Sequence, residues 1–196
     1  MAARTAVNQK RIPIISTEGV WIFGYGSLMW DPGFTCLEAQ PALLRGYHRA
    51  FCIYSIRFRG TPERPGLVLG LDRGGSCRGR VFRVAAAKAD EVFAYLYDRE
   101  MIHEVYTPKY LPVHLSDRTV WAHTYVANRN HQRYTGKLSL EQSARLILDG
   151  WGKRGSNVDY LKNTVYHLDD LGISDGPVHR LLEVVQQMCG SGVLSR

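Results

Sequence analysis

Two short stretches of the sequence combine residue types that could carry out chemistry. The first is Gly24-Tyr25-Gly26-Ser27-Leu28, directly after the apolar run of residues 20–23. Its glycines let the backbone approach a ligand closely, and successive N–H groups in a turn after a strand form a concave site for an anion. The hydroxyls of Tyr25 and Ser27 could add hydrogen bonds that orient the ligand. A tight turn that needs small residues explains the same pattern, so both interpretations stay open.

The second stretch ends in Glu100. It follows an apolar stripe that predicts a helix over residues 86–99, so Glu100 is expected at or just beyond the helix C-terminus. The negative end of the helix dipole and partial burial both disfavour the ionised carboxylate, and they raise its pKa above the ordinary value of about 4.3. A general base for an amine needs a shift in this direction. The alternative is a surface carboxylate paired with Arg99 or another nearby cation.

Several other chemistries are disfavoured by residue spacing. The stretch Gly24–Met29 has Met at the last glycine position of a dinucleotide fingerprint and does not fit G-x-S-x-G. His103-Glu104 has Thr107 where a zinc protease needs its second histidine. The four cysteines form neither a C-x-x-C pair nor a zinc-finger spacing, and the sequence has no P-loop. We therefore expect no metal and no other cofactor.

Composition narrows the function classes further. The 196 residues suit one domain, and 45% hydrophobic with 22% charged residues is typical of a globular protein. The net charge of +7 favours anionic partners. Because the Lys and Arg residues are scattered rather than clustered, we expect no nucleic-acid partner. No apolar run approaches the roughly 18 residues of a membrane span, so no membrane partner is expected either.

The N-terminal segment and the cysteines suggest a location. Residues 1–18 hold no apolar core of signal-peptide length and are expected to be disordered or loosely attached. Cys36 and Cys52 lie in apolar stretches and are expected to be buried. These features favour a cytoplasmic protein in which residues 19–190 form a single domain. The sequence does not fix the oligomeric state.

The pattern of apolar residues predicts a strand-rich front and a helical C-terminal third, which makes the fold class α+β. Strands are expected over residues 20–23, 43–44, 50–54, 67–71, 79–84, 110–115 and 119–127. Residues 72–76 are predicted to be the loop between two of them, and Pro108 and Pro112 predict an edge strand or a break. Ser139 and Gln142 form a capping box for a helix that stops at Gly150. Two more helices are expected, one from about residue 157 to 172 and one over 178–188.

Four parts of the sequence resemble the ChaC-type γ-glutamylcyclotransferases, over about residues 19–175. They are the stretch Val20-Trp21-Ile22-Phe23-Gly24-Tyr25-Gly26-Ser27-Leu28-Met29-Trp30, the proline-glycine loop of residues 59–66, Tyr95-Leu96-Tyr97-Asp98-Arg99-Glu100, and the tail segments 134–139 and 157–161. The resemblance implies a small mixed β-barrel with surrounding helices. It also implies cleavage of glutathione into 5-oxoproline and cysteinylglycine without a cofactor.

The same resemblance implies roles for individual residues. Glu100 matches the catalytic glutamate, and Tyr25, Gly26, Ser27 and Leu28 are the substrate-binding residues. Many family members have Gly-Gly-Tyr within two residues of this glutamate. Here residues 101–105 replace the glycine pair, and Tyr106 is expected to take the role of the tyrosine and bind substrate. This difference leaves the γ-glutamyl substrate open.

Alternatives remain at the level of both residue and function. Glu104 is a second carboxylate that competes with Glu100 as the base, although only Glu100 matches the motif. Arg57, Arg59 and Tyr106 are candidates for binding the far end of the peptide. The alternative functions are a non-catalytic regulatory protein, since relatives have been labelled cation-transport regulators, and a cyclotransferase for another γ-glutamyl amine.

Overall fold

Five strands of the computed structural model form a closed barrel. The structure describes residues 19–101 and 104–190; the expected loose segment 1–18 and His103 lie outside these ranges. The barrel strands are β1 (Val20–Gly24), β2 (Glu38–Ser55), β3 (Gly66–Val84), β4 (Tyr106–His114) and β5 (Thr119–Ala127). Their order is β1-β3-β2-β4-β5, and parallel pairing of Trp21 and Ile22 with β5 closes the barrel. All other barrel pairs are antiparallel, which confirms the expected mixed barrel.

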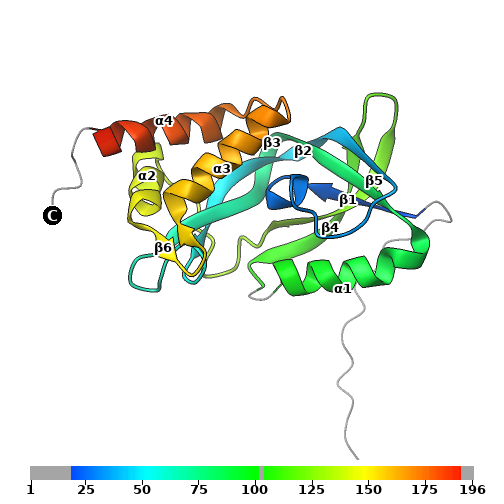
Figure 1. The fold of residues 1–196 in the computed structure, drawn as a ribbon, viewed down its shortest axis with the longest axis horizontal. Helices are drawn as coiled ribbons and strands as arrows, with labels where there is room; N and C mark the ends of the chain where they lie inside the picture. The colour runs from blue at the N-terminus through cyan, green and yellow to red at the C-terminus, as the bar shows by residue number, and fades with distance from the viewer. Residues whose placement is uncertain (1–18, 102–103, 191–196) are drawn as a thin grey trace, which may run out of the picture.

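The helices lie in two places around this barrel (Figure 1). Helix α1 (Ala89–Glu100) follows the short 3-10 helix η2 (Ala86–Lys88) and lies apart from the others. Helices α2 (Leu140–Asp149), α3 (Asn157–Asp170) and α4 (Gly176–Gly190) gather together, with the small hairpin of β6 (Trp151–Gly152) and β7 (Gly155–Ser156) between α2 and α3. This confirms the helical C-terminal third. None of the helices within the described ranges is long and apolar enough to cross a membrane.

The helix starts follow from capping, as the sequence predicts. The Ser139 hydroxyl accepts a hydrogen bond from the Gln142 N–H, and the Gln142 side chain accepts one from the Ser139 N–H. Ser156 caps α3 by accepting from the Asp159 N–H. The second cap also sets the position of Asn157, whose fully buried side chain bonds both backbone groups of Leu67 on β3. Helix α3 is therefore fixed to the barrel at its first turn.

Two hydrophobic clusters meet at the end of β1. The larger joins the barrel interior to α2, α3 and α4, through residues such as Leu67, Ile147 and Leu161. The smaller packs α1 against the barrel through Leu96 and Phe82. Tyr25 belongs to the larger cluster and Leu28 to the smaller one. The segment that follows β1 thus lies at the boundary between the two clusters.

Residues 67–71 and 79–84 lie in a strand as expected, but the predicted loop 72–76 between them is wrong, because β3 runs unbroken through it. Strands β2 and β3 form one long antiparallel ribbon, with a register shift between Arg45 and Tyr47. Gly74 and Gly75 have φ values of 101° and 66°. Glycines that predict a hairpin turn therefore make an irregularity within a continuous ribbon instead.

The first of the two alternatives predicted from the prolines is confirmed, because their part of β4 is an edge and is not broken. Pro108 and Pro112 lie on a stretch that pairs with β5 alone, and β2 joins only at the last two residues of β4, Val113 and His114. A proline is tolerated there because no second neighbour needs its missing N–H. Cys52 is buried as expected, whereas Cys36 is only partly buried against the smaller cluster.

Candidate active site

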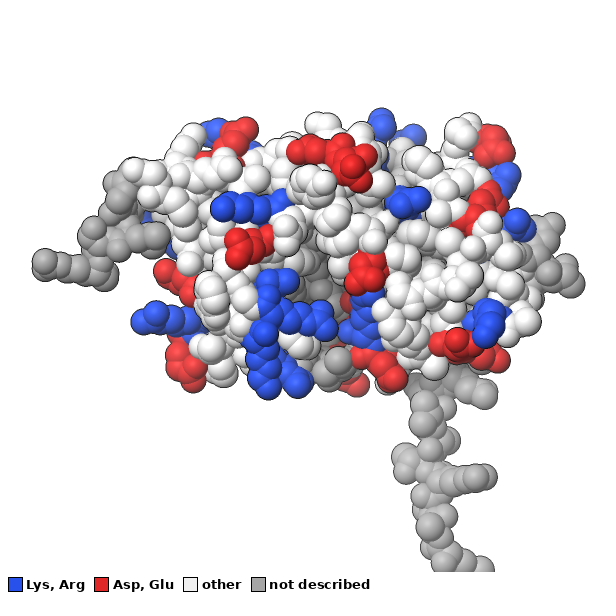
Figure 2. Space-filling model, in the orientation of Figure 1, with Lys and Arg blue, Asp and Glu red and all other residues white. Residues whose placement is uncertain are grey.

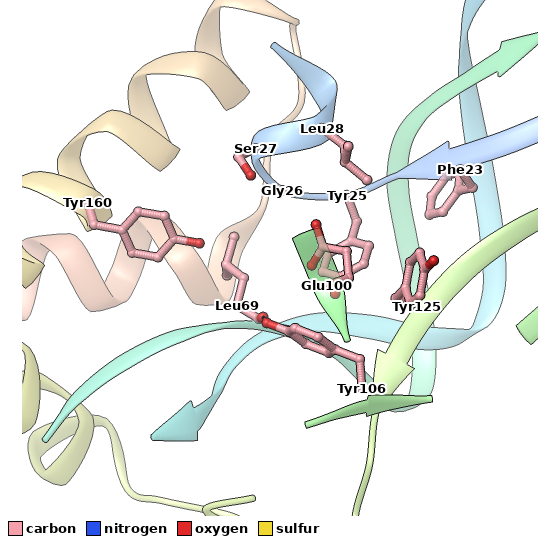
Figure 3. A pocket seen from close by; sticks show the side chains of 10 residues that line it. All are labelled: Phe23, Tyr25, Gly26, Ser27, Leu28, Leu69, Glu100, Tyr106, Tyr125 and Tyr160. Atoms are coloured by element: carbon pink, nitrogen blue, oxygen red, sulfur yellow. Dashed lines mark hydrogen bonds between the residues drawn. The ribbon is translucent and has the colours of Figure 1, made fainter. Parts of the chain in front are cut away.

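The structure brings the two stretches singled out in the sequence to one small cavity of about 50 Å³. Glu100, the last residue of α1, faces the segment Tyr25–Leu28, which leads from β1 into the 3-10 helix η1 (Ser27–Met29). Figure 3 shows the Glu100 carboxyl pointing toward this segment, with the Tyr160 ring across the cavity. The lining residues are Phe23, Tyr25, Gly26, Ser27, Leu28, Leu69, Glu100, Tyr106, Tyr125 and Tyr160.

The backbone of the segment after β1 is folded tightly against the cavity. The Met29 N–H donates to the Gly26 carbonyl at 2.8 Å and the Asp31 N–H to the Ser27 carbonyl at 2.7 Å. The N–H groups of residues 26–28 precede the first of these bonds, as at any helix start. A Cβ atom on Gly26 would lie 3.4 Å from the Leu69 side chain. The hydrogen bonds confirm a tight turn, and Gly26, Ser27 and Leu28 line the cavity, whereas their role as a cradle for a ligand stays a prediction.

A buried arginine that does not line the cavity holds the same segment. Arg49 of β2 is 2% exposed, and its Nε donates to the Tyr25 carbonyl at 2.5 Å. Its Nη1 pairs with Asp175 at 2.5 Å, just before α4, and its Nη2 donates to the Arg78 carbonyl at 2.7 Å. Charged hydrogen bonds inside a protein are among the stronger ones. Arg49 therefore fixes the Tyr25 carbonyl and leaves the other side of the segment to the cavity.

A second arginine, Arg99, connects α1 to the segment that follows β1. Its Nη2 donates to the Ser27 hydroxyl at 2.7 Å and its Nη1 to the Asp31 carbonyl at 2.9 Å. Its Nε lies 3.3 Å from a carboxylate oxygen of Glu100. The arginine thus contacts both parts of the candidate site at once. The pairing of Glu100 with Arg99 that the sequence left open does occur, but between side chains that are only 18% and 20% exposed rather than on the open surface.

Burial is the main influence on the pKa of Glu100. Removal of the carboxylate from water raises the pKa of Glu100 above its usual range, and the charge and hydrogen bond of Arg99 oppose this rise. The net direction is upward, as the sequence analysis predicts. Its main cause is burial in the cavity, since the Glu100 side chain is only 18% exposed. Such a carboxylate accepts a proton more readily than an exposed one.

Four tyrosines make up much of the cavity wall, and only two of them are sequence candidates. Burial raises the pKa of Tyr25 and Tyr106 well above the usual phenol range and that of Tyr160 to about 12, so all three stay protonated. The Tyr106 hydroxyl donates to the Leu69 carbonyl at 2.7 Å. Tyr125 and Tyr160 were missed as site residues. Tyr160 lies in one of the tail segments that carry the resemblance, which was the available signal.

The other candidates from the sequence lie elsewhere. Glu104 is exposed, has a φ of 52° and does not line the cavity. Arg57 and Arg59 line a wider groove that continues from the cavity and shares Ser27, Glu100, Tyr106 and Tyr160 with it. Among the described residues, no three or more His, Cys, Asp or Glu side chains are grouped so that they could hold a metal ion.

Comparison with known families fits this arrangement. Residues 20–188 match the family model described as ChaC-like protein. The chain belongs to the ChaC-like family. The match spans the whole barrel, both parts of the cavity and nearly all of the C-terminal helices of this ChaC-like chain.

Individual relatives show the same likeness. The chain is 36% identical over 170 residues to the glutathione-specific γ-glutamylcyclotransferase of Escherichia coli (strain K12). The aligned region covers 86% of this chain and 74% of that protein. It is 34% identical over 149 residues to the glutathione-specific γ-glutamylcyclotransferase 1 of Mus musculus, covering 74% and 67%. The crystal structure of a γ-glutamyl cyclotransferase specific to glutathione from yeast superposes with a TM-score of 0.78 over 87% of this chain and 96% of that one. Since the sequence identity to the yeast protein is 24%, this likeness concerns the fold of the ChaC-like chain.

Proposed function

We propose that this ChaC-like protein is a γ-glutamylcyclotransferase that cleaves glutathione into 5-oxoproline and cysteinylglycine. The observation that carries the proposal is the position of Glu100, a largely buried carboxylate facing the segment Tyr25–Leu28 across one cavity. The family membership and the names of the relatives support the same reaction and the same substrate.

The chemistry is an intramolecular acyl transfer. The α-amine of the glutamyl part attacks the γ-carbonyl carbon of the same molecule and closes a five-membered lactam. Because both groups belong to one substrate, holding it in the cyclising conformation supplies much of the acceleration, up to roughly 7–11 kcal/mol in well-oriented systems. A small cavity with aromatic residues at half of its lining positions suits this task, since it leaves a folded glutamyl part little freedom.

Glu100 is assigned the proton transfers. The α-amine is protonated in water and cannot attack in that form, so the Glu100 carboxylate first takes one proton from it. The new C–N bond then forms, and the bond between the γ-carbon and the cysteine nitrogen breaks. Protonated Glu100 gives its proton to the departing nitrogen. The second proton that the attacking nitrogen must lose to become the lactam N–H follows the same route through Glu100, so cysteinylglycine leaves with a protonated amine. Glu100 ends in its initial state, and the steps use neither water nor a cofactor.

The segment after β1 is assigned to the glutamyl part. The backbone N–H groups around Gly26–Leu28 precede the first η1 hydrogen bond and lie beside the cavity. They suit the carboxylate of the glutamyl part or the oxygen that becomes negative during attack, where one lost donor typically costs about 3–4 kcal/mol. The hydroxyls of Tyr25 and Ser27 and the ring of Tyr106 complete the binding site. In this proposal, residues 19–190 act as one domain, because residues of both hydrophobic clusters line the cavity.

A panel of γ-glutamyl compounds tests the function. The purified protein is incubated with glutathione, γ-glutamylcysteine and γ-glutamyl amines that lack a peptide, and 5-oxoproline is measured. We expect release from glutathione and little from the amines. Absence of 5-oxoproline with every compound would reject the proposal. Release from a γ-glutamyl amine but not from glutathione would favour the alternative of a cyclotransferase for another γ-glutamyl amine. The cytoplasmic location stays a prediction from the sequence.

A further inference from the structure

The groove that continues from the cavity carries an uneven distribution of charge. Its arginines are Arg57, Arg59, Arg99, Arg133 and Arg154, and its acidic side chains are Asp31, Asp98 and Glu100. Two of the acids belong to α1, and Asp31 follows η1 closely. On the face shown in Figure 2, Lys and Arg side chains gather around a hollow in the lower middle of the view. The part of the groove away from α1 is thus basic.

Two of these arginines are held together around one aromatic ring. The guanidinium carbon of Arg57 lies 5.5 Å from the centre of the Phe58 ring, and that of Arg154 lies 4.7 Å from it. The backbone supports this arrangement, because the Lys153 N–H donates to the Arg57 carbonyl at 2.8 Å and the Arg154 N–H to the Phe58 carbonyl at 3.0 Å. The turn between β6 and β7 is therefore fixed to the segment that follows β2, and Arg57 and Arg154 both line the groove.

Neither of these cations is neutralised within the protein. Among the described residues, no ion pair includes Arg57 or Arg154, whereas Arg99 pairs with Glu100. Two like charges held near one ring repel each other, and a bound anion relieves that repulsion. The guanidinium fork also matches a carboxylate in shape and can donate two hydrogen bonds to it. This part of the groove is therefore suited to a carboxylate.

The connection between this basic part and the cavity defines which carboxylate could reach it. Tyr160 lines both the cavity and the groove, and the guanidinium carbon of Arg59 lies 5.0 Å from the centre of its ring. Arg59 Nη1 donates to the carbonyls of Arg154 and Ser156, so it is occupied with the backbone of the β6–β7 hairpin. A peptide whose glutamyl end lies beside Glu100 would extend past Tyr160 toward Arg57 and Arg154.

We propose that Arg57 and Arg154 form a subsite for the free carboxylate at the C-terminal end of the γ-glutamyl peptide. This inference rests on the proposed function. It assigns substrate selection to the groove: the glycine carboxylate of glutathione binds both guanidinium groups, while the glutamyl end occupies the cavity. Substrates that lack this second carboxylate lose the contact.

The test compares glutathione with its C-terminal amide, in which the glycine carboxylate is replaced by a neutral carboxamide. We expect the wild-type protein to release 5-oxoproline from the amide with a kcat/KM at least about tenfold lower than from glutathione, the effect of losing a charged hydrogen bond. Arg57→Gln and Arg154→Gln should lower the kcat/KM for glutathione by a similar factor and leave that for the amide unchanged. Arg45→Gln is the matched control, because Arg45 is exposed and lines neither the cavity nor the groove.

A binding experiment separates this inference from the proposed reaction. Calorimetric titration of Glu100→Gln with glutathione and with the amide measures selection without turnover, and we expect glutathione to bind about tenfold more tightly. The subsite would be overturned if the wild-type protein had the same kcat/KM for glutathione and for the amide, and Glu100→Gln bound the two with the same affinity. A preference for the acid that survives in both arginine variants would overturn it too. A protein that prefers the acid in titration but releases no 5-oxoproline would contradict the proposed function and retain the subsite.

Discussion

Replacement of Arg99 by glutamine is expected to remove the connection between Glu100 and the segment Tyr25–Leu28. The change removes the hydrogen bonds to the Ser27 hydroxyl at 2.7 Å and to the Asp31 carbonyl at 2.9 Å, together with the contact to Glu100 at 3.3 Å. The bond to Asp31 is exposed, so water replaces it at little cost. The partly buried bond to Ser27 counts for about 1.5–3 kcal/mol. If that energy orders the segment Tyr25–Leu28 for the reaction, kcat/KM falls about ten- to hundredfold.

The pH dependence gives Arg99→Gln a second readout. Arg99 lowers the pKa of Glu100, so its removal lets the pKa of the buried carboxyl rise further. Glu100 acts as a base only when it is ionised, and the acidic limb of the kcat profile must therefore move to higher pH. The assay is 5-oxoproline release from glutathione across pH, with Arg99→Lys as the variant that keeps the charge. Unchanged kcat/KM, or an acidic limb that moves to lower pH in Arg99→Gln, would refute this reasoning.

Three further predictions concern stability. Tyr106→Phe leaves the Leu69 carbonyl without its 2.7 Å donor, and urea unfolding should show a loss of about 1–3 kcal/mol. Asn157→Ala deprives both backbone groups of Leu67 of their partners, and calorimetry should show a Tm lower by about 5–15 °C. Because the folded-state pKa of Glu100 is raised, its ionised form opposes folding as pH increases above about 4. Glu100→Gln should therefore melt above the wild-type protein at pH 7, and this advantage should vanish below about pH 4.

Each of these has its own control. Tyr110→Phe removes a phenol on the same strand that lies partly exposed outside the cavity, and it should cost little. Asn163→Ala removes an exposed amide from the same helix and should cost little. A Tm difference between Glu100→Gln and the wild-type protein that does not change with pH would contradict the effect of burial on this carboxyl.

The sequence predicted those features that depend on neighbouring residues. The capping box at Ser139, the cap at Ser156 and the end of α1 at Glu100 each follow from a local pattern, and the structure confirms them. The upward direction of the Glu100 pKa also followed, because a carboxyl after an apolar helical stripe tends to be buried. The mixed barrel was expected from the family resemblance rather than from periodicity.

Features that depend on contacts between residues far apart in the chain could not be predicted from the sequence. The glycines of residues 74–75 have the local signature of a turn, and only their pairing with β2 shows that the ribbon continues through them. Arg49 gives no local sign that it reaches both the Tyr25 carbonyl and Asp175, 126 positions along the chain. Tyr160 enters the site because Asn157 fixes the first turn of α3 to β3. Such contacts become visible only when the fold is known.

The most direct test of the account is the turnover of glutathione by Glu100→Gln beside Glu104→Gln and Asp98→Asn. The first variant keeps the shape of the side chain but removes the base, whereas Glu104 lies outside the cavity and Asp98 lines only the groove. We predict that 5-oxoproline release falls about 10²- to 10⁴-fold in Glu100→Gln, while glutathione binding is retained and the other two variants stay near the wild-type rate. Normal release by Glu100→Gln, or loss of release in Glu104→Gln, would contradict the assignment of the base.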